Sequence, residues 1–293
     1  MSVTVGDWIE GARLRTLPAA IAPVVVGTAA AVKLGAIEPF RVILALSVAI
    51  FLQIGVNFAN DYSDGIRGTD DHRVGPPRLT GAGKVSPQTV RNVAFACFAV
   101  AGVAGLVLVV LSGTWFFIAL GALAIAAAWF YTGGRSPYGY MGIGLSEFLV
   151  FVFFGLLATV GTTYTQVFLA PWWVWLSAAS LGLISVALLM VNNIRDISTD
   201  RESGKTTLPV RLGAFPSRVI YMATVLLPAL GMVIVFAWLP ASCTVCLVPT
   251  ILFSAYLSQK MTQATTREEF LALLRDTGLY SLVWSAMFVM AVV

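Results

Sequence analysis

The sequence contains few charged residues. Of its 293 residues, 11% are charged and 58% are hydrophobic, and the mean hydropathy is +0.88. A soluble domain averages about 25% charged residues. So few charged residues are not enough to cover a surface that faces water. We therefore expect a lipid bilayer to surround most of the chain.

Histidine and cysteine are also scarce. His72 is the only histidine in the sequence, which argues against haem, histidine-ligated metals and histidine-based catalytic triads. Cys243 and Cys246 form a CxxC pair, but no second pair or nearby histidine completes a zinc set. We therefore interpret these two cysteines and Cys97 as small residues buried in lipid. The formal net charge of +4 suits contact with anionic lipid headgroups, and we expect no nucleic-acid partner.

Long apolar runs dominate the remaining sequence. Runs of about 20 apolar residues mark membrane-spanning helices. The expected fold is therefore an all-α, polytopic membrane protein that forms a single domain over residues 1–293. We predict nine spans, at about residues 18–34, 41–60, 90–112, 114–132, 145–163, 172–194, 218–239, 241–258 and 277–293.

The distribution of basic residues predicts the orientation of these spans. With nine spans and a cytoplasmic N-terminus, 16 of the basic residues fall on the inner side, and Lys33 and Arg41 fall on the outer side. This asymmetry follows the positive-inside rule. The two long connections, at about 61–89 and 195–217, are then cytoplasmic. We expect them to form a cap over a reaction site on the inner face.

A short pattern occurs twice along the chain. Asn57 is followed four residues later by Asp61, and Asn192 is followed four residues later by Asp196, an offset of 135 residues. Both copies end a predicted span and open one of the two long cytoplasmic connections. The repeat predicts two four-helix pseudo-repeats in parallel orientation, followed by a ninth helix. Binding sites in such proteins tend to lie where the repeats meet.

Each copy places several polar side chains on one helix face. Residues at i, i+3, i+4 and i+7 of a helix share a face. Carboxylates at membrane depth are costly and mark functional sites, although a solvated helix end with capping residues is the plainer alternative. The first set comprises Asn57, Asn60, Asp61 and Asp64, and the second comprises Asn192, Asp196 and Asp200.

Four carboxylates facing one cavity would repel each other unless divalent cations bind between them. Ligands that are all oxygen, with no cysteine or histidine, favour Mg²⁺, which usually completes its shell with substrate phosphates. An apolar bundle below such a site would accept a long hydrocarbon tail. We therefore expect a lipid diphosphate as the substrate. The predicted metal ligands are Asp61, Asp64, Asp196 and Asp200, together with Asn60.

Two other classes of membrane protein use acidic clusters. A cation-coupled transporter would carry polar residues towards the outer face, where these spans have almost none. A metal-dependent lipid phosphotransferase of the CDP-alcohol type would need a DGxxAR run, which Asp64-Gly65-Ile66-Arg67 does not match. The pattern therefore favours an enzyme that acts on a lipid diphosphate.

The acidic motifs resemble those of the UbiA superfamily of intramembrane prenyltransferases, and the resemblance covers nearly the whole chain. Asn60 to Asp64 matches the start of the family motif NDxxDxxxD, but Gly68 replaces its third aspartate, and Asp70 and Asp71 follow as candidates to substitute for it. The second family motif, DxxxD, is matched by Asp196 and Asp200. A YxxxK-type motif is similar to residues 131–135, with arginine in place of lysine. Within the superfamily, the runs 13–18, 60–76, 131–134 and 205–213 resemble the branch that prenylates 1,4-dihydroxy-2-naphthoate in menaquinone biosynthesis.

This resemblance implies nine helices around a central cavity in the bacterial plasma membrane, with the active site on the cytoplasmic side. The implied Mg²⁺-dependent reaction joins a polyprenyl chain from polyprenyl diphosphate to 1,4-dihydroxy-2-naphthoate, with loss of CO₂ and diphosphate, and gives demethylmenaquinone. Another acceptor, such as haem, 4-hydroxybenzoate or a phosphosugar, is the alternative within the superfamily. The implied partners are thus the two substrates and membrane lipid.

The expected roles of the site residues follow from this chemistry. The four aspartates hold Mg²⁺ on the diphosphate, and replacing Asp61 or Asp196 by asparagine should abolish turnover. Tyr131 is expected to shield the allylic cation with its ring. Glu147 either contacts the acceptor or is an interfacial carboxylate. The remaining predicted substrate-binding residues are Asn57, Asn60 and Asn192, which orient the metal, and Arg67, Arg135 and Lys205, which offset negative charge.

Overall fold

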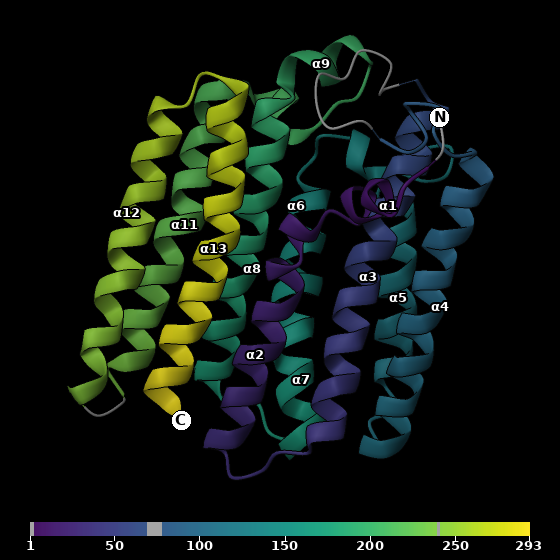
Figure 1. The fold of residues 1–293 in the computed structure, drawn as a ribbon. Coiled ribbons are helices and arrows are strands. Elements are labelled where there is room, and N and C mark those ends of the chain that lie inside the picture. The colour runs from purple at the N-terminus through teal and green to yellow at the C-terminus, as the bar shows by residue number, and fades with distance from the viewer. Residues whose placement is uncertain (1–2, 69–77, 239–240) are drawn as a thin grey trace.

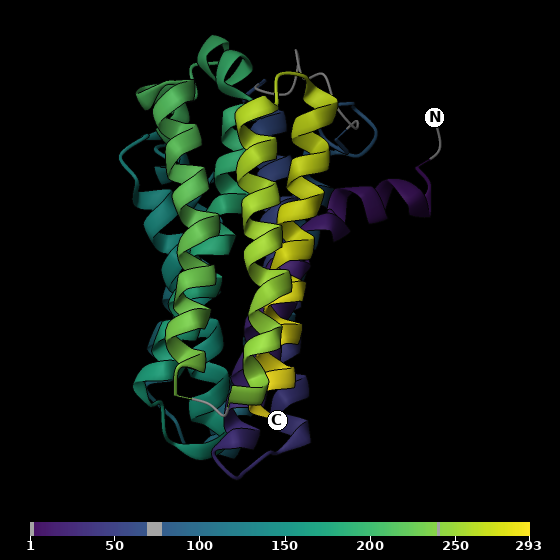
Figure 2. The ribbon, with the colours of Figure 1, turned by 90° about the vertical axis from the view of Figure 1, so that its left-hand side faces the viewer.

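The computed structural model describes residues 3–68, 78–238 and 241–293 as an all-helical bundle. The long helices run side by side, and the amino-terminal helix α1 (Val5–Ala12) projects sideways from one end of the bundle (Figures 1 and 2). The long helices are α2 (Pro18–Lys33), α3 (Pro39–Ile66), α4 (Pro87–Ser112), α5 (Phe117–Phe130), α8 (Trp172–Arg195), α11 (Ala214–Phe236), α12 (Leu247–Gln263) and α13 (Arg267–Val292). A further span comprises α6 (Leu145–Val150), a π-helical segment (Phe151–Leu157) and α7 (Ala158–Val167).

Within the described residues, five helices are long and apolar enough to cross a membrane: α3, α4, residues 145–167, α8 and α11. A sixth candidate is formed by residues 5–33, which bend by 51° between Thr16 and Pro18. Helix α5 has 14 residues and α12 has 17. Helix α13 begins with charged residues, including Glu268 and Glu269. Nine spans therefore remain a prediction.

The outer faces of the bundle are apolar. Val103 on α4 is 63% exposed, Leu123 on α5 is 58% exposed, and Leu252 on α12 is 65% exposed. Exposed apolar surface of this kind is unfavourable in water and favourable against lipid tails. It indicates that the bundle is surrounded by a bilayer.

The boundaries of α4 illustrate how local sequence defines the helices. The Ser86 side chain accepts a hydrogen bond from Thr89 N–H at the start of the helix, and Pro87 occupies its first turn. At the other end, Gly113 has φ 71°, which ends the helix and separates α4 from α5. The sequence predicted this same boundary between the third and fourth spans.

The carboxyl-terminal helices pack into a hydrophobic core. Tyr221, Tyr280 and Trp284 are fully buried between α11 and α13. The Tyr280 hydroxyl donates to Val225 O at 3.1 Å, and the Trp284 indole N–H donates to Pro228 O at 3.0 Å. Since lipid supplies no hydrogen bonds, these internal partners hold α13 firmly against α11.

A close glycine contact places α8 beside the π-helical segment. A Cβ atom on Gly155 would lie 2.4 Å from the Cα of Gly182 on α8, so neither position has room for a side chain. Small residues allow helix backbones to approach closely in membranes. The π-helical turn lies at this crossing, and such turns are frequent near functional sites.

The ends of α3 and α8 meet at the same end of the bundle. This end also carries the short helices α9 (Ile197–Glu202) and α10 (Leu208–Leu212). Figure 1 shows α1 and α9 towards the top of the bundle, with the carboxyl terminus at the opposite end. The fold thus brings the two acidic motifs to one end of the bundle.

Candidate active site

A cavity of about 880 Å³ lies inside the bundle, between α2, α3, α5, residues 145–167 and α8. The middle of α3 lines it with apolar side chains such as Ala45, Val48 and Leu52. The last turns of α3 contribute Asn57 and Asp64 instead. The cavity therefore has an apolar body and a polar end, as a site for a lipid with a charged head requires.

Both acidic motifs reach the polar end of this cavity. The first motif contributes Asn57, Asn60 and Asp64 from α3. The second motif contributes Asn192, Asp196 and Asp200 from the end of α8 and from α9. The structure thus brings together residues that are more than 120 positions apart in the chain.

Asp64 is buried and contacts two side chains from other segments. Arg78 Nη1 donates to Asp64 Oδ2 at 2.6 Å, and the same nitrogen donates to Asn60 O at 3.1 Å. The Tyr140 hydroxyl donates to Asp64 Oδ1. Asp64 is 4% exposed and yet lines the cavity, so its carboxylate is positioned by the protein rather than by water.

Asp61 lies one turn earlier on α3 but has a different environment. Its Oδ2 accepts a hydrogen bond from Leu79 N–H at 3.0 Å, and its Oδ1 accepts one from Thr80 N–H at 2.9 Å. The residue is 1% exposed and is absent from the described side chains that line the cavity. The contacts show Asp61 fastening the segment that carries Arg78 to α3.

The i, i+4, i+8 spacing of the second motif suggested one continuous helix, but the structure has a break within it. Helix α8 ends at Arg195, and Asp196 has φ −98° and ψ 12° before α9 begins at Ile197. The polar side chains at this break provide an alternative to helical geometry. Arg195 donates to both oxygens of Asp196, from Nε at 2.7 Å and from Nη2 at 2.6 Å.

Asp200 on α9 is the carboxylate that most needs a cation. It is 8% exposed, and its Oδ2 is buried and receives no hydrogen bond from the described residues. Lys205 Nζ lies 3.5 Å from the other oxygen. Burial raises the pKa of Asp200 to about 6; Lys205 opposes this shift, whereas the charges of Asp196 and Asp64 add to it.

Tyr140 connects the two motifs. Arg67, just after α3, lies over its ring at 5.3 Å from the ring centroid, and Lys205 lies over the ring at the same distance. A parallel bridge between Met141 and Thr206 ties the two connecting segments together. Together with its hydrogen bond to Asp64, Tyr140 therefore fixes the loop at 203–207 above the first motif.

The other predicted site residues are distributed unevenly. Tyr131 lines the cavity, as expected for a side chain that shields a cation. Arg67 donates to Thr132 O and Gly134 O and so holds the turn after α5. Arg135 is exposed and outside the described lining of the cavity.

Glu147 and two acidic residues of the first connection need separate mention. Glu147 also lies outside the described lining of the cavity, and its Oε1 is buried with no hydrogen-bond partner among the described residues. Asp70 and Asp71, the candidates to replace the third aspartate, lie outside the described residues.

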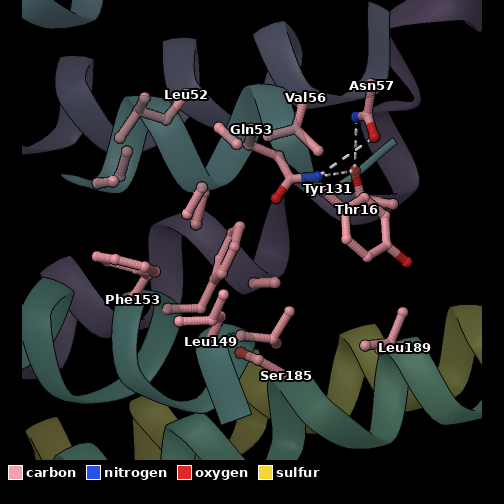
Figure 3. A pocket seen from close by; sticks show the side chains of 18 of the residues that line it. Thr16, Leu52, Gln53, Val56, Asn57, Tyr131, Leu149, Phe153, Ser185 and Leu189 are labelled. Atoms are coloured by element: carbon pink, nitrogen blue, oxygen red, sulfur yellow. Dashed lines mark hydrogen bonds between the residues drawn. The ribbon is translucent and has the colours of Figure 1, made fainter. Parts of the chain in front are cut away.

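The sequence did not single out Thr16 and Gln53, which join Asn57 in a polar group deeper in the cavity. We name Thr16, Gln53 and Asn57 the polar shelf; their hydrogen bonds are drawn in Figure 3. Gln53 lies four residues before Asn57 and shares its helix face, which is the signal that could have revealed it. Arg78, Arg195 and Tyr140 are further site residues that the motifs alone did not assign.

The oxygen ligands at the polar end fit a magnesium ion that is held partly by the protein and partly by a substrate. The described residues contain no group of three acidic, histidine or cysteine side chains close enough to form a complete metal centre. Mg²⁺ commonly binds one or two carboxylates and takes its other ligands from phosphate and water. Asp200 Oδ2, which receives no hydrogen bond from the described residues, and the neighbouring carboxylate of Asp196 match that mode of binding.

Comparison with known proteins identifies the family. A model of the UbiA prenyltransferase family matches residues 20–286. The chain belongs to this family. It is 48% identical over 281 residues to the 1,4-dihydroxy-2-naphthoate octaprenyltransferase of Mycobacterium tuberculosis, a match that covers 95% of this chain and 94% of that protein.

Solved structures of UbiA homologues share the fold. The apo UbiA homologue from Aeropyrum pernix K1 aligns with a TM-score of 0.70 at 16% identity, over 92% of this chain and 97% of that one. The UbiA homologue from Archaeoglobus fulgidus bound to GPP and Mg²⁺ aligns with a TM-score of 0.65 at 13% identity, over 96% and 99%. At these identities the likeness concerns the fold alone.

Proposed function

We propose that this UbiA family member transfers a polyprenyl chain from polyprenyl diphosphate to 1,4-dihydroxy-2-naphthoate, releases CO₂ and diphosphate, and gives demethylmenaquinone. The observation that carries the choice of acceptor is the 48% identity to the mycobacterial octaprenyltransferase over 95% of the chain. The cavity supports the choice of donor, because it combines an apolar body with a polar end. Family membership also favours a transferase over the cation-coupled transporter.

The polar end offers both kinds of partner that a magnesium diphosphate needs. Asp64 and Asp200 face the cavity while paired with Arg78 and Lys205. When the donor binds, the cationic side chains would turn to phosphate oxygens, and the carboxylates, with Asp196, would hold Mg²⁺. Bound Mg²⁺ would neutralise the diphosphate and stabilise it as a leaving group. The Archaeoglobus fulgidus homologue with GPP and Mg²⁺ supports this role.

The chain itself supplies the surroundings of the reacting carbon. As the C1–O bond breaks, the electron pair leaves with the diphosphate and an allylic cation forms. The ring of Tyr131 lines the cavity where it can face that cation. The apolar walls exclude water that would otherwise capture it. The aromatic acceptor attacks the cation, and departure of CO₂ leaves its electron pair in the ring, so no base is needed at that carbon.

The location of the reaction follows from the sequence. The basic residues predict nine spans in a bacterial plasma membrane, with both acidic motifs on the cytoplasmic side. The two motifs do lie at one end of the bundle in the structure (Figure 1). Accessibility of cysteines introduced singly at residues 84 and 135 to a membrane-impermeant reagent would test this orientation in inverted and right-side-out vesicles. We expect labelling in inverted vesicles only.

The direct test is transfer by the purified protein. With farnesyl diphosphate, Mg²⁺ and 1,4-dihydroxy-2-naphthoate, we expect a prenylated and decarboxylated product, and we expect chelation of Mg²⁺ to stop its formation. Parallel reactions with 4-hydroxybenzoate, haem and a phosphosugar establish the acceptor. Transfer to one of these in place of the naphthoate would contradict the proposed acceptor, and ion flux in proteoliposomes without any transfer would contradict the reaction class.

A further inference from the structure

The polar shelf lies in the wall of the cavity, and Asn57 joins it to the first acidic motif. Gln53 Nε2 donates to Thr16 Oγ1 at 2.9 Å, and Asn57 Nδ2 donates to the same oxygen at 3.0 Å. Asn57 Nδ2 also donates to Ala12 O at 2.9 Å. Gln53 is 7% exposed and Asn57 is 3% exposed, yet both line the cavity.

The hydrogen bonds of Thr16 determine which way the Gln53 amide points. The Thr16 hydroxyl donates to Arg13 O at 2.9 Å, so its only proton is used and its oxygen is left to accept. Since Thr16 Oγ1 acts as an acceptor, the group of Gln53 that faces it must be the NH₂ group and not the carbonyl. Gln53 Oε1 therefore points away from Thr16 and into the cavity, as Figure 3 shows.

Gln53 Oε1 lacks a partner within the protein. None of the described residues donates a hydrogen bond to it. Ser185, across the cavity in Figure 3, donates its hydroxyl proton to Leu181 O at 3.0 Å and is already paired. The carbonyl oxygen opens onto the cavity, so a ligand in the cavity that carries a donor would form a hydrogen bond that the described residues do not offer.

The surroundings of this carbonyl fit an aromatic ring. Leu52, Val56, Leu149 and Phe153 line the cavity around it (Figure 3). Gln53 precedes Asp64 by 11 residues on α3, which places it roughly 16 Å away along the helix axis at ~1.5 Å per residue. This separation leaves room for a diphosphate next to Asp64 and a ring next to Gln53.

We propose that Gln53 Oε1 accepts a hydrogen bond from a ring hydroxyl of the aromatic acceptor, and that the polar shelf thereby selects hydroxylated rings. This inference rests on the proposed function and adds the residue that recognises the acceptor. A hydroxyl that donates to a carbonyl leaves more electron density in its ring, which favours attack on the allylic cation. An ether at the same ring position has no proton to donate and leaves Gln53 Oε1 unpaired.

The first experiment separates the two substrates kinetically. Gln53→Met keeps the length of the side chain but removes its carbonyl. We expect the KM for 1,4-dihydroxy-2-naphthoate to rise about tenfold or more, while the KM for farnesyl diphosphate stays within about twofold. Gln166→Met is the matched control, because Gln166 is also a buried glutamine but lies outside the described lining of the cavity. If Gln53→Met does not fold, Gln53→Asn replaces it, since it withdraws the carbonyl by one methylene.

The second experiment detects the hydrogen bond itself. The two monomethyl ethers of 1,4-dihydroxy-2-naphthoate are tested as competitive inhibitors of the wild-type protein and of Gln53→Met. We expect the wild-type protein to bind one ether about tenfold more weakly than the other, and Gln53→Met to bind the two alike. A merely structural role of Gln53 would leave this discrimination unchanged.

The outcomes distinguish this inference from the proposed function. A wild-type protein that prenylates the naphthoate, together with a Gln53→Met variant that keeps the acceptor KM and the discrimination between ethers, contradicts only the role of Gln53. A rise in the KM for farnesyl diphosphate alone would assign the carbonyl to the donor and also overturn the inference. A wild-type protein that does not prenylate the naphthoate contradicts the proposed function and, with it, this acceptor.

Discussion

Asp61 and Asp196 occupy equivalent places in the sequence repeat but have different surroundings in the fold. Each follows an asparagine by four residues. Asp61 is 1% exposed, and backbone N–H groups of Leu79 and Thr80 occupy its two oxygens. The Asp196 side chain is 30% exposed, pairs with Arg195 and lines the cavity. An aspartate at a repeated position is therefore not by itself evidence that its carboxylate is available to a metal.

The carboxylates that face the cavity have a common arrangement instead. Asp64 pairs with Arg78, and Asp200 pairs with Lys205, each cation coming from the segment that follows the motif. In both motifs the pair lies at the polar end of the cavity, where a diphosphate would contact both members. The structural correspondence thus relates Asp64 to Asp200, whereas the sequence offset relates Asp61 to Asp196.

The strongest way to break this correspondence is to neutralise Asp64 or Asp200. We expect Asp64→Asn and Asp200→Asn each to lower turnover by at least about a hundredfold, because each removes a carboxylate that faces the diphosphate site. The dependence of activity on Mg²⁺ concentration should shift to higher concentration in both variants. Thermal unfolding of the purified variants in detergent serves as the folding control. Near-normal turnover by a folded variant would contradict the assignment of that residue.

Replacing Asp61 should lower activity for a different physical reason. Asp61→Ala leaves the N–H groups of Leu79 and Thr80 without acceptors, at a cost of roughly 1–3 kcal/mol each. We expect a lower Tm, and a KM for farnesyl diphosphate raised about tenfold because Arg78 is no longer held in place. The Mg²⁺ concentration for half-maximal activity should stay near the wild-type value. Asp61→Asn keeps one accepting oxygen, so its Tm and its KM for farnesyl diphosphate should lie between those of the wild-type protein and Asp61→Ala.

A shifted Mg²⁺ requirement in Asp61→Ala would instead favour the sequence-based prediction that Asp61 is a metal ligand. Gly65→Ala offers an independent perturbation of the same contact, because a Cβ atom there would lie 2.4 Å from Thr80 Cγ2. We expect it to reproduce the raised KM for farnesyl diphosphate while leaving every carboxylate in the sequence.

The sequence predicted the helices well where they are apolar and less well where they become polar. The span predicted at 172–194 agrees with α8, which runs from Trp172 to Arg195. The span predicted to end at residue 60 continues instead to Ile66. Polar residues usually signal a helix end, but those in the last turns of α3 bond to neighbouring segments and remain helical. Hydropathy does not register partners of that kind.

The candidate site was predictable as a meeting of two motifs but not in its contacts. Helical spacing alone placed Asn57, Asn60 and Asp64 on one face, and all three line the cavity. The partners of these residues come from distant segments: Tyr140 lies 76 positions beyond Asp64. The contacts of Asp61 are to backbone N–H groups, which every sequence contains and no motif reveals.

Tyr140 provides a smaller perturbation that acts on both motifs. Tyr140→Phe removes the hydrogen bond to Asp64 but keeps the ring that contacts Arg67 and Lys205. We expect turnover to fall about tenfold, in line with the loss of one hydrogen bond to a charged group. Tyr140→Leu also removes the ring, so its turnover should be lower still. Equal activity of the two variants would show that the ring contacts contribute nothing to catalysis.

The smallest effect is expected at Arg135, which the sequence placed in the site by analogy with a lysine motif. Arg135 is exposed and outside the described lining, whereas Lys205 lines the cavity beside Asp200. Both residues carry one positive charge near the same end of the bundle, so they form a matched pair in which only the position differs. We expect Arg135→Ala to change the KM for farnesyl diphosphate by less than about twofold, and Lys205→Ala to raise it about tenfold, because charge in contact with water is screened and charge in the cavity is not. A large effect of Arg135→Ala would mean that the turn after α5 moves over the cavity when the diphosphate binds.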